Sequence, residues 1–290
     1  MTRVNLALLR GVCQTPAYAA QECGFFRNRG LDVKIQVAST AWLVPEQMVS
    51  GAMDFAVIPW TRVAVASSRE EDLILICGSG CEEAALVLRA GVALDDVHTL
   101  AVPQEGGIKD LTAAALVQSL GWQDRQKLRM PSGDGAILAL VGQGADAASM
   151  VEPYATALEE QGLGSVVKRT GDVWPGAPGC SLTTTQRMID RDPELVREVV
   201  AAFVEGAAFV EENPADAAAI AEGYIGVHRN FIERALEHNQ PSVDALSNHD
   251  AMDAILSLMI ELGYIDQKPT GFADLSHLEA LRQNTFSQAV

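Results

Sequence analysis

Two stretches of the chain share one pattern: VSGAMDFAVIPW at residues 49–60 and VGQGADAASMVEPY at residues 141–154. In each, a valine is followed five positions later by an aspartate, Asp54 or Asp146, and two positions after that by an alanine. Each stretch ends in proline and an aromatic residue. We predict that one structural unit occurs twice, in which a helix ending near glycine leads into a strand and then into a proline–aromatic corner.

Strand and helix patterns alternate around both stretches. The predicted strands cover residues 4–9, 31–38, 54–60 and 73–80, then 99–104, 127–132, 146–151 and 165–171. The segments between them have apolar residues at helical spacing, and this alternation predicts largely parallel sheets with helices on both faces. From about residue 187 the chain is almost wholly helical, and PGAPG at 175–179 is a natural crossover.

The predicted fold class is α/β, with two lobes, a ligand cleft between them and a helical C-terminal tail. Lobe 1 is expected to contain residues 1–84 plus 180–290, including the C-terminal helices, and lobe 2 residues 85–179. Ligands of open parallel sheets bind beyond the carboxyl ends of the strands, so the cleft is expected there.

Composition excludes several classes of partner. The chain has 290 residues and a net charge of −17, which argues against nucleic acid and against anionic membrane surfaces. No apolar run is long enough to predict a membrane span. Five irregularly spaced cysteines favour free thiols over a disulfide framework, and none of the five histidines has metal-ligand spacing. We therefore expect no metal and no cofactor.

The amino terminus, MTRVNLALLRG, has one early arginine and a short apolar run. This pattern fits a first strand better than a signal peptide. The expected location is cytoplasmic for the sequence as written, and periplasmic or otherwise extracytoplasmic if a leader has been removed.

Four segments resemble a known family: ECGFFRNRGLDVKI, MVSGAMDFAV, LVGQGADAASMVEPYATALEEQG and DPELVREVVAAFVEGAAFVEENPADAAAIA. They look like the type II periplasmic-binding-protein superfamily, and more narrowly its SsuA/THI5/NMT1-like branch of solute-binding proteins. The resemblance extends to about residue 235. It implies two lobes that close on a small molecule such as a sulfonate, carboxylate or pyrimidine, with an ABC permease as partner.

A minority of this superfamily are enzymes, so a second function stays open. The segment VIPWTRVAV has Thr61 and no histidine, which argues against the THI5-type synthase. The segment VCQTPAYAAQECGF resembles the desulfinases, which carry a catalytic cysteine at the position of Cys13. The alternative to a binding protein is therefore a cytosolic desulfinase- or decarboxylase-like lyase with Cys13 as its reactive group. A cytosolic sensor that binds without delivering is a third, weaker reading.

The candidate ligand-binding residues follow the carboxyl ends of predicted strands or begin the next helix. They offer hydroxyl and amide groups, aromatic faces, a carboxylate, and glycines whose backbone N–H groups can approach an anion. They are Cys13, Gln14, Ser39, Thr40, Trp42, Trp60, Thr61, Gln104, Gly106, Gly107, Ser132, Glu152 and Tyr154. Glu152 has two alternatives, a ligand contact or a local pair with Arg or Lys.

Overall fold

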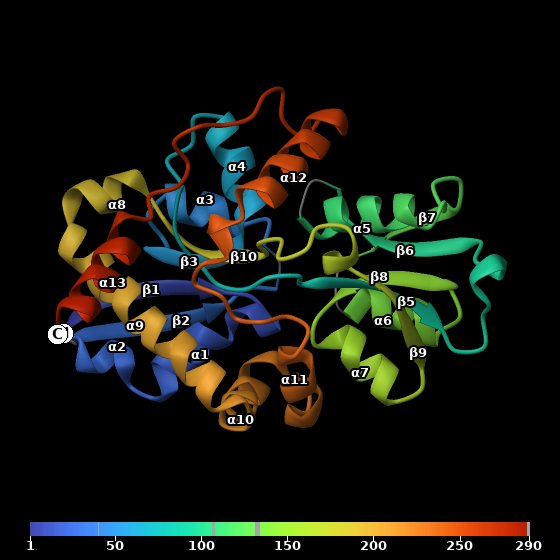
Figure 1. Ribbon diagram of the computed structural model, residues 1–290, viewed down its shortest axis with the longest axis horizontal. Coiled ribbons are helices and arrows are strands. Elements are labelled where there is room, and N and C mark those ends of the chain that lie inside the picture. The colour runs from blue at the N-terminus through green and yellow to red at the C-terminus, as the bar shows by residue number, and fades with distance from the viewer. Residues whose placement is uncertain (40, 106–107, 131–133, 289–290) are drawn as a thin grey trace.

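Two five-stranded sheets form the framework of the computed structural model, which describes residues 1–39, 41–105, 108–130 and 134–288 (Figure 1). The first sheet has the order β2-β1-β3-β10-β4 and the second β7-β6-β8-β5-β9. The strands of the first sheet are β1 (Thr2–Leu8), β2 (Leu31–Val37), β3 (Phe55–Pro59), β4 (Ile74–Gly78) and β10 (Cys180–Thr184). Those of the second are β5 (Ala84–Arg89), β6 (Thr99–Pro103), β7 (Gln126–Met130), β8 (Ala147–Val151) and β9 (Gly164–Arg169).

Both sheets are mixed, and the expectation of largely parallel sheets is wrong for two strands. β1 pairs in parallel with β2 and β3, as β6 does with β7 and β8. β10, however, is antiparallel to β3 and β4, and β5 is antiparallel to β8 and β9. The chain reaches β5 directly from the first sheet, and it reaches β10 directly from the second sheet. They therefore start at the edge where the parallel strands end, and they must run in the opposite direction.

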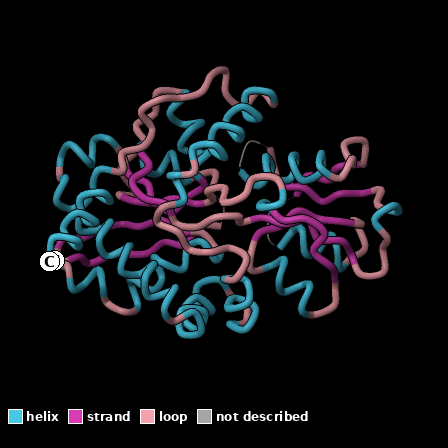
Figure 2. The backbone as a smooth tube through the Cα atoms, viewed as in Figure 1, coloured by secondary structure: helices cyan, strands magenta, loops and turns pink. Residues whose placement is uncertain are grey.

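Helices cover both faces of each sheet (Figure 2). Those that precede β10 are α1 (Thr15–Glu22), α2 (Phe25–Asn28), α3 (Val44–Val49), α4 (Trp60–Ser68), α5 (Ile108–Ser119), α6 (Asp134–Val141) and α7 (Tyr154–Glu160). Those that follow it are α8 (Gln186–Arg191), α9 (Pro193–Glu212), α10 (Pro214–Ile225), α11 (Arg229–Leu236), α12 (His249–Glu261) and α13 (Ser276–Gln288). The predicted helical tail is therefore present.

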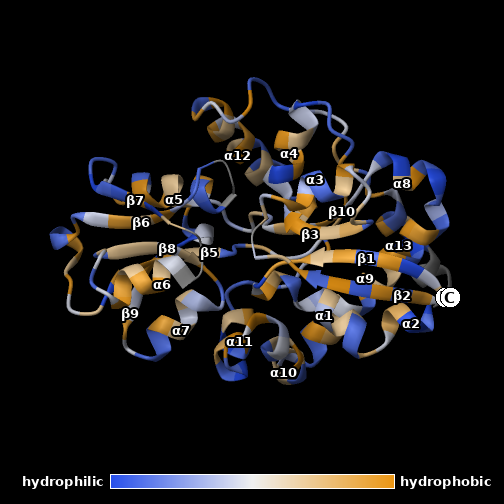
Figure 3. Cartoon of the chain, turned by 180° about the vertical axis from the view of Figure 1, so that it is seen from behind, coloured by the Kyte–Doolittle hydropathy of each residue, from blue (hydrophilic) through white to orange (hydrophobic). Residues whose placement is uncertain are grey.

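The hydrophobic core lies on the faces of the two sheets. Strands β3, β4, β8 and β10 are buried along their whole length. Figure 3 shows that the strands of both sheets are mostly hydrophobic, whereas the blue residues gather on the outer helix faces and loops. In the part of the chain that the structure describes, every helix is too short or too polar to span a membrane.

The repeated sequence stretch is a repeated structural unit, as predicted. The backbone N–H of Asp54 donates to Asn5 O at 3.0 Å, and its Oδ2 accepts from Asn5 N at 2.8 Å. Asp146 makes the same pair of contacts with Thr99, at 2.9 and 3.0 Å. Asp54 thus fixes β3 against β1, and Asp146 fixes β8 against β6. Each corner then starts a helix at its aromatic residue, α4 in one sheet and α7 in the other.

Two crossover segments connect the sheets and run side by side. Residues 79–83 lead from β4 to β5, and residues 170–179 lead back to β10. A bridge pairs Cys81 with Pro178, and Gly179 N donates to Gly80 O at 2.9 Å. The predicted PGAPG crossover lies in the second segment. The exact lobe boundaries proposed from the sequence stay a prediction.

Candidate ligand-binding site

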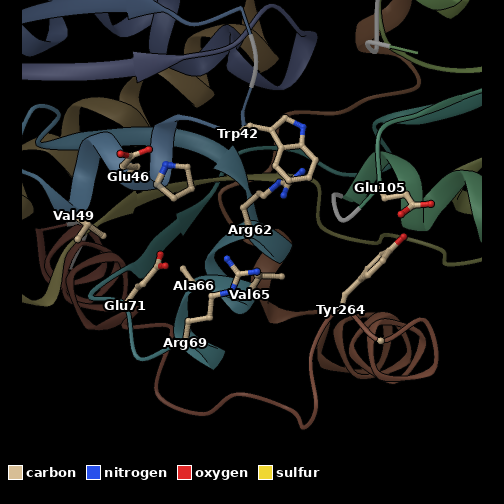
Figure 4. Close-up of a pocket in the computed structure, with 12 residues that line it drawn as sticks. Trp42, Glu46, Val49, Arg62, Val65, Ala66, Arg69, Glu71, Glu105 and Tyr264 are labelled. Atoms are coloured by element: carbon tan, nitrogen blue, oxygen red, sulfur yellow. The ribbon is translucent and has the colours of Figure 1, made fainter. Parts of the chain in front are cut away.

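A pocket of about 660 Å³ lies where the loops after β2, β3 and β6 meet (Figure 4). Trp42 comes from the loop after β2, Arg62 from the first turn of α4, and Glu105 from the loop after β6. Tyr264, just after α12, completes this wall. Most of the other lining residues belong to α3 and α4 or directly follow α4, and Glu105 is the one described lining residue that the second sheet contributes.

Arg62 is the most distinctive side chain of this pocket. Its guanidinium carbon lies 3.5 Å from the centre of the Trp42 ring, in a cation–π contact. Burial lowers the pKa of Arg62 to about 10, although the charge of Asp110 opposes this shift, so the group is still protonated at neutral pH. Its Nε is buried and has no hydrogen-bond partner among the described residues. An anion placed here would meet a partly desolvated positive charge with a free donor.

The wall contributed by the second sheet carries a partly compensated negative charge. The Glu105 carboxylate lies 3.2 Å from Arg129 Nη2, and 72% of its side chain is exposed. Arg129 also pairs with Asp110, so it offsets only part of the Glu105 charge. Solvent around the exposed Glu105 carboxylate screens its repulsion of an anion at Arg62.

Tyr264 links the C-terminal region to the second sheet. Its hydroxyl donates to the carboxylate of Asp110 on α5, and the same carboxylate pairs with Arg129 on β7. The Asp110 side chain is only 5% exposed, so its charge depends on these two partners. Tyr264 therefore lines the pocket and connects the two sheets across it.

The structure brings part of the predicted set to this cleft. Trp42 is 49% exposed and lines the pocket. Ser39 and Gln104 are exposed just after β2 and β6. The predicted residues that lie outside the described part of the chain are Thr40, Gly106, Gly107 and Ser132.

Trp60 and Thr61 lie beneath the pocket, in the core. Trp60 is fully buried, its indole N–H donates to Pro178 O at 2.9 Å, and its ring stacks on Phe272 at 6.4 Å between centroids. Thr61 is 1% exposed, and its hydroxyl has no hydrogen-bond partner among the described residues. The faces of Trp60 that were predicted to contact a ligand are thus occupied by the protein itself.

Cys13 and Gln14 form a buried turn, the 3₁₀ helix Val12–Gln14, at the contact between the two sheets. Gln14 Oε1 accepts from Leu9 N, and its Nε2 donates to Cys13 Sγ, both at 3.2 Å. The neighbouring Val12 N donates to Glu152 O at 3.3 Å across the sheets. Both groups of the Gln14 side-chain amide therefore form hydrogen bonds that stabilise the turn.

The Cys13 thiol is not activated as a nucleophile. Burial raises its pKa, Glu83 raises it further, and the hydrogen bonds with Cys180 and Gln14 oppose the shift without reversing it. A cysteine nucleophile requires the opposite, a pKa lowered by a base or a positive charge. No observation therefore supports the lyase alternative.

Glu152 and Tyr154 lie at the second proline–aromatic corner. The Glu152 carboxylate pairs with Arg169 through Oε1 and accepts from Thr156 N at 3.0 Å through Oε2. Of the two alternatives for Glu152, the structure shows the local pair. Tyr154 is 7% exposed, at the start of α7.

Of the described residues that line the pocket, Trp42 alone was in the predicted set; Arg62, Glu105 and Tyr264 are among those that were missed. Arg62 had a usable signal, since it follows a strand end in the first turn of a helix, but the same pattern is typical of a solvated helix residue. Glu105 follows a predicted strand without any distinguishing pattern. Tyr264 had no signal, because the tail folds back to the cleft only in three dimensions.

Three solved structures of similar fold are named as ligand-binding or solute-binding proteins. The ligand-binding component of an ABC-type import system from Staphylococcus aureus, solved with zinc bound, aligns with a TM-score of 0.83 at 12% identity, covering 96% of this chain and 98% of that one. The periplasmic nitrate-binding protein NrtA from Synechocystis aligns at 0.80 and 15% identity, covering 98% and 89%. The alkanesulfonate-binding protein SsuA from Xanthomonas axonopodis, bound to MOPS, aligns at 0.76 and 14%, covering 94% and 98%.

At these identities the similarity establishes the periplasmic-binding-protein fold. The family follows from the sequence itself: the profile of the NMT1-like family matches residues 1–225, so the chain belongs to the NMT1-like family. No curated protein sequence matches the chain.

Proposed function

We propose that this chain is a solute-binding protein that holds a small anionic molecule in the pocket between its two sheets. The observation that supports this most strongly is Arg62, a partly buried guanidinium that lines the pocket and whose Nε has no hydrogen-bond partner among the described residues. Two of the similar structures are named for anionic solutes, nitrate and alkanesulfonate. The pocket volume of about 660 Å³ is in the range that small-molecule sites occupy.

The two main contacts define the chemistry of the ligand. Arg62 suits a carboxylate or sulfonate, whose oxygens can accept from the guanidinium. Trp42, held against Arg62 and half exposed, offers its remaining surface to an apolar or planar group. The favoured ligand is therefore a small organic acid with an aromatic or alkyl part, and a pyrimidine with an anionic substituent fits the same description.

Binding to a panel of compounds tests this proposal. Sulfonates, aromatic carboxylates, nitrate and pyrimidines are screened by thermal shift, and the compounds that stabilise the chain are then titrated by calorimetry. Arg62→Gln removes the charge while keeping much of the length of the side chain. We expect it to weaken binding of an anion by about 10–100-fold, which corresponds to loss of a charged hydrogen bond.

Arg27→Gln is the matched control, because it removes the same charge from an exposed position on α2, across the first sheet from α4 (Figure 1). It is expected to leave the affinity unchanged. Equal affinities for the wild type and Arg62→Gln would overturn the proposed site, and failure of every anion to stabilise the chain would overturn the proposed ligand class.

Recovery of the ligand separates binding from catalysis. The ligand is incubated with a stoichiometric amount of the chain, released by denaturation and identified by mass spectrometry. Because the pKa of Cys13 is raised rather than lowered, we expect the ligand to be recovered intact. A product that disappears in Cys13→Ser would contradict the binding function in favour of the lyase.

An ABC permease as partner and an extracytoplasmic location belong to the same proposal. They are supported by the periplasmic proteins of similar fold that serve nitrate and sulfonates. Fractionation of cells that produce the protein from its own gene tests the location, and recovery in the cytoplasm alone would contradict it.

A further inference from the structure

Three buried side chains gather where the turn after β1 meets both crossover segments. Cys13 lies in the turn, Glu83 ends the first crossover just before β5, and Cys180 opens β10 directly after the second. Their sulfur and carboxylate oxygen atoms all lie within 4.8 Å of one another. The three residues are 5%, 7% and 2% exposed, so the cluster is shielded from solvent.

The carboxylate in this cluster has no positive partner among the described residues. Glu83 Oε1 accepts a hydrogen bond from Cys180 N, and no described Lys, Arg or His forms an ion pair with it. A buried carboxylate that lacks a cation is costly, and so is each buried thiolate. A divalent metal ion held between these groups would compensate two of the three negative charges.

Glycines on the crossover segments leave room for the cluster. A Cβ at Gly179 would lie 2.2 Å from Glu83 Cγ, and a Cβ at Gly80 would lie 3.2 Å from Cys13 Cβ. The side chains of the cluster therefore pack directly against the backbone of these two glycines. A side chain at either glycine would displace them. The Gln14 amide, which donates to Cys13 Sγ at 3.2 Å, fixes the orientation of one sulfur from outside the cluster.

We propose that Cys13, Glu83 and Cys180 bind a thiophilic divalent cation of the zinc type. Two cysteine sulfurs at about 2.3 Å and a carboxylate oxygen at about 2.0–2.2 Å are ligands that zinc takes, with water in a fourth position. Tetrahedral geometry with these bond lengths places ligand atoms roughly 3.3–3.8 Å apart. The ligand atoms, which lie within 4.8 Å of one another, therefore need to approach by at most about 1.0–1.5 Å. Binding releases the two thiol protons to solvent.

The proposed site differs from the sequence-based expectation of no metal, which was based on ligand spacing along the chain. The three residues are far apart in sequence, and only the crossovers bring them together. Because the ligands belong to three segments that join the two sheets, a bound cation would hold these segments in one arrangement. The site is separate from the pocket at Arg62, and its test is independent of the proposed function.

Cobalt(II) is the probe that tests this site, since sulfur-to-cobalt charge transfer gives an absorption band in the near ultraviolet. The reduced full-length chain is titrated under inert gas. We expect a band that saturates at a single cobalt ion per chain and disappears when zinc(II) is added. Cys13→Ser and Cys180→Ser should each reduce the band by about half and weaken cobalt binding at least tenfold. Glu83→Gln should keep the band but weaken binding about tenfold.

Controls distinguish the site from general thiol chemistry. Cys77→Ser changes another fully buried thiol outside the cluster and should leave the titration unchanged, as should Arg62→Gln. Glu83→Gln keeps the shape of the side chain and an acceptor for Cys180 N, so it tests the site even if a serine variant fails to fold. No band in the wild type, a band that all three cluster variants retain with unchanged affinity, or an equal loss in Cys77→Ser would overturn the proposal.

Discussion

Asp54 and Asp146 explain why the same short pattern occurs twice. Asp54 directly precedes β3 and Asp146 directly precedes β8, and each side chain accepts a backbone N–H of the neighbouring parallel strand, β1 or β6. An aspartate at this point supplies one more hydrogen bond than the strand ladder alone provides, at the position where pairing begins. The repeat in sequence is therefore a repeat of strand registration rather than of ligand contacts.

Asp146→Asn tests this role through its pH dependence. Burial disfavours the charged form of Asp146, but the N–H groups of His98 and Thr99 and the Arg89 guanidinium outweigh it and hold its pKa below the ordinary value. The stabilisation is therefore present above the pKa of the unfolded chain, about 3.9, and is lost as pH falls through the lower folded value.

We expect Asp146→Asn to lower the free energy of unfolding by about 1 kcal/mol at neutral pH, and the difference from wild type to shrink below pH about 4. Urea unfolding at several pH values measures this. Asp95→Asn, at an exposed position, should have little effect at any pH. A difference that is constant from neutral to acidic pH would show that the charge of Asp146 is not the cause.

Single residues were predicted unevenly from the sequence. Trp42, which follows a strand end, lines the pocket, and its contact with a ligand stays a prediction. Trp60 follows a strand end too, yet its ring packs on Phe272, a residue of the tail whose position no local pattern reveals. Arg62 was set aside because burial and a stacked indole, the features that make it distinctive, arise from tertiary structure.

At the scale of elements, α1 and α9 approach closely at one glycine. Gly206 lies in the buried face of α9, and a Cβ there would lie 2.1 Å from Pro16 O and 3.1 Å from Ala20 Cβ, both on α1. The first contact is with backbone, which cannot rotate away. The absence of a side chain at Gly206 therefore sets the distance between the two helices.

Gly206→Ala is expected to lower the free energy of unfolding by about 1–3 kcal/mol, the usual cost of overpacking a core, despite the higher helix propensity of alanine. Gly223→Ala is the matched control, because Gly223 is exposed on α10 and a Cβ there meets nothing within 4 Å. It should stabilise the chain by about 0.5–1 kcal/mol. Denaturant unfolding of both variants checks this, and stabilisation by Gly206→Ala would contradict the close helix approach.

Elements with a strong local pattern were predicted well. The direction of the strands that enter a sheet from the other sheet was not. Asp192 followed by Pro193 is a local sequence signal for the start of α9, and Asp192 Oδ1 accepts from Leu195 N at 3.0 Å. The helix expected over 15–30 divides into α1 and α2 at Gly24, where φ is 79°. The reversed direction of β5 and β10 depends on the crossovers and has no signal in either strand.

For the whole molecule, the Tyr264–Asp110 hydrogen bond is a link between the C-terminal region and the second sheet. In a two-lobed binding protein, a link across the cleft favours the closed arrangement and so raises affinity for a ligand that binds this arrangement. We expect Tyr264→Phe to weaken ligand binding about 10–100-fold, the value of one hydrogen bond to a charged acceptor.

Tyr224→Phe is the control for this prediction, since the Tyr224 hydroxyl donates to Glu22, on the same side of the cleft. Calorimetric titration of both variants with the same anion provides the comparison. If the two variants lose affinity equally, the effect is not a property of the link between the sheets.

A crystal structure with the best-bound anion tests the central claim most directly. The account predicts that the carboxylate or sulfonate oxygens lie within hydrogen-bond distance of the Arg62 guanidinium, with the rest of the molecule against Trp42. Electron density for the ligand at another place on the chain, with no contact to Arg62, would contradict the account.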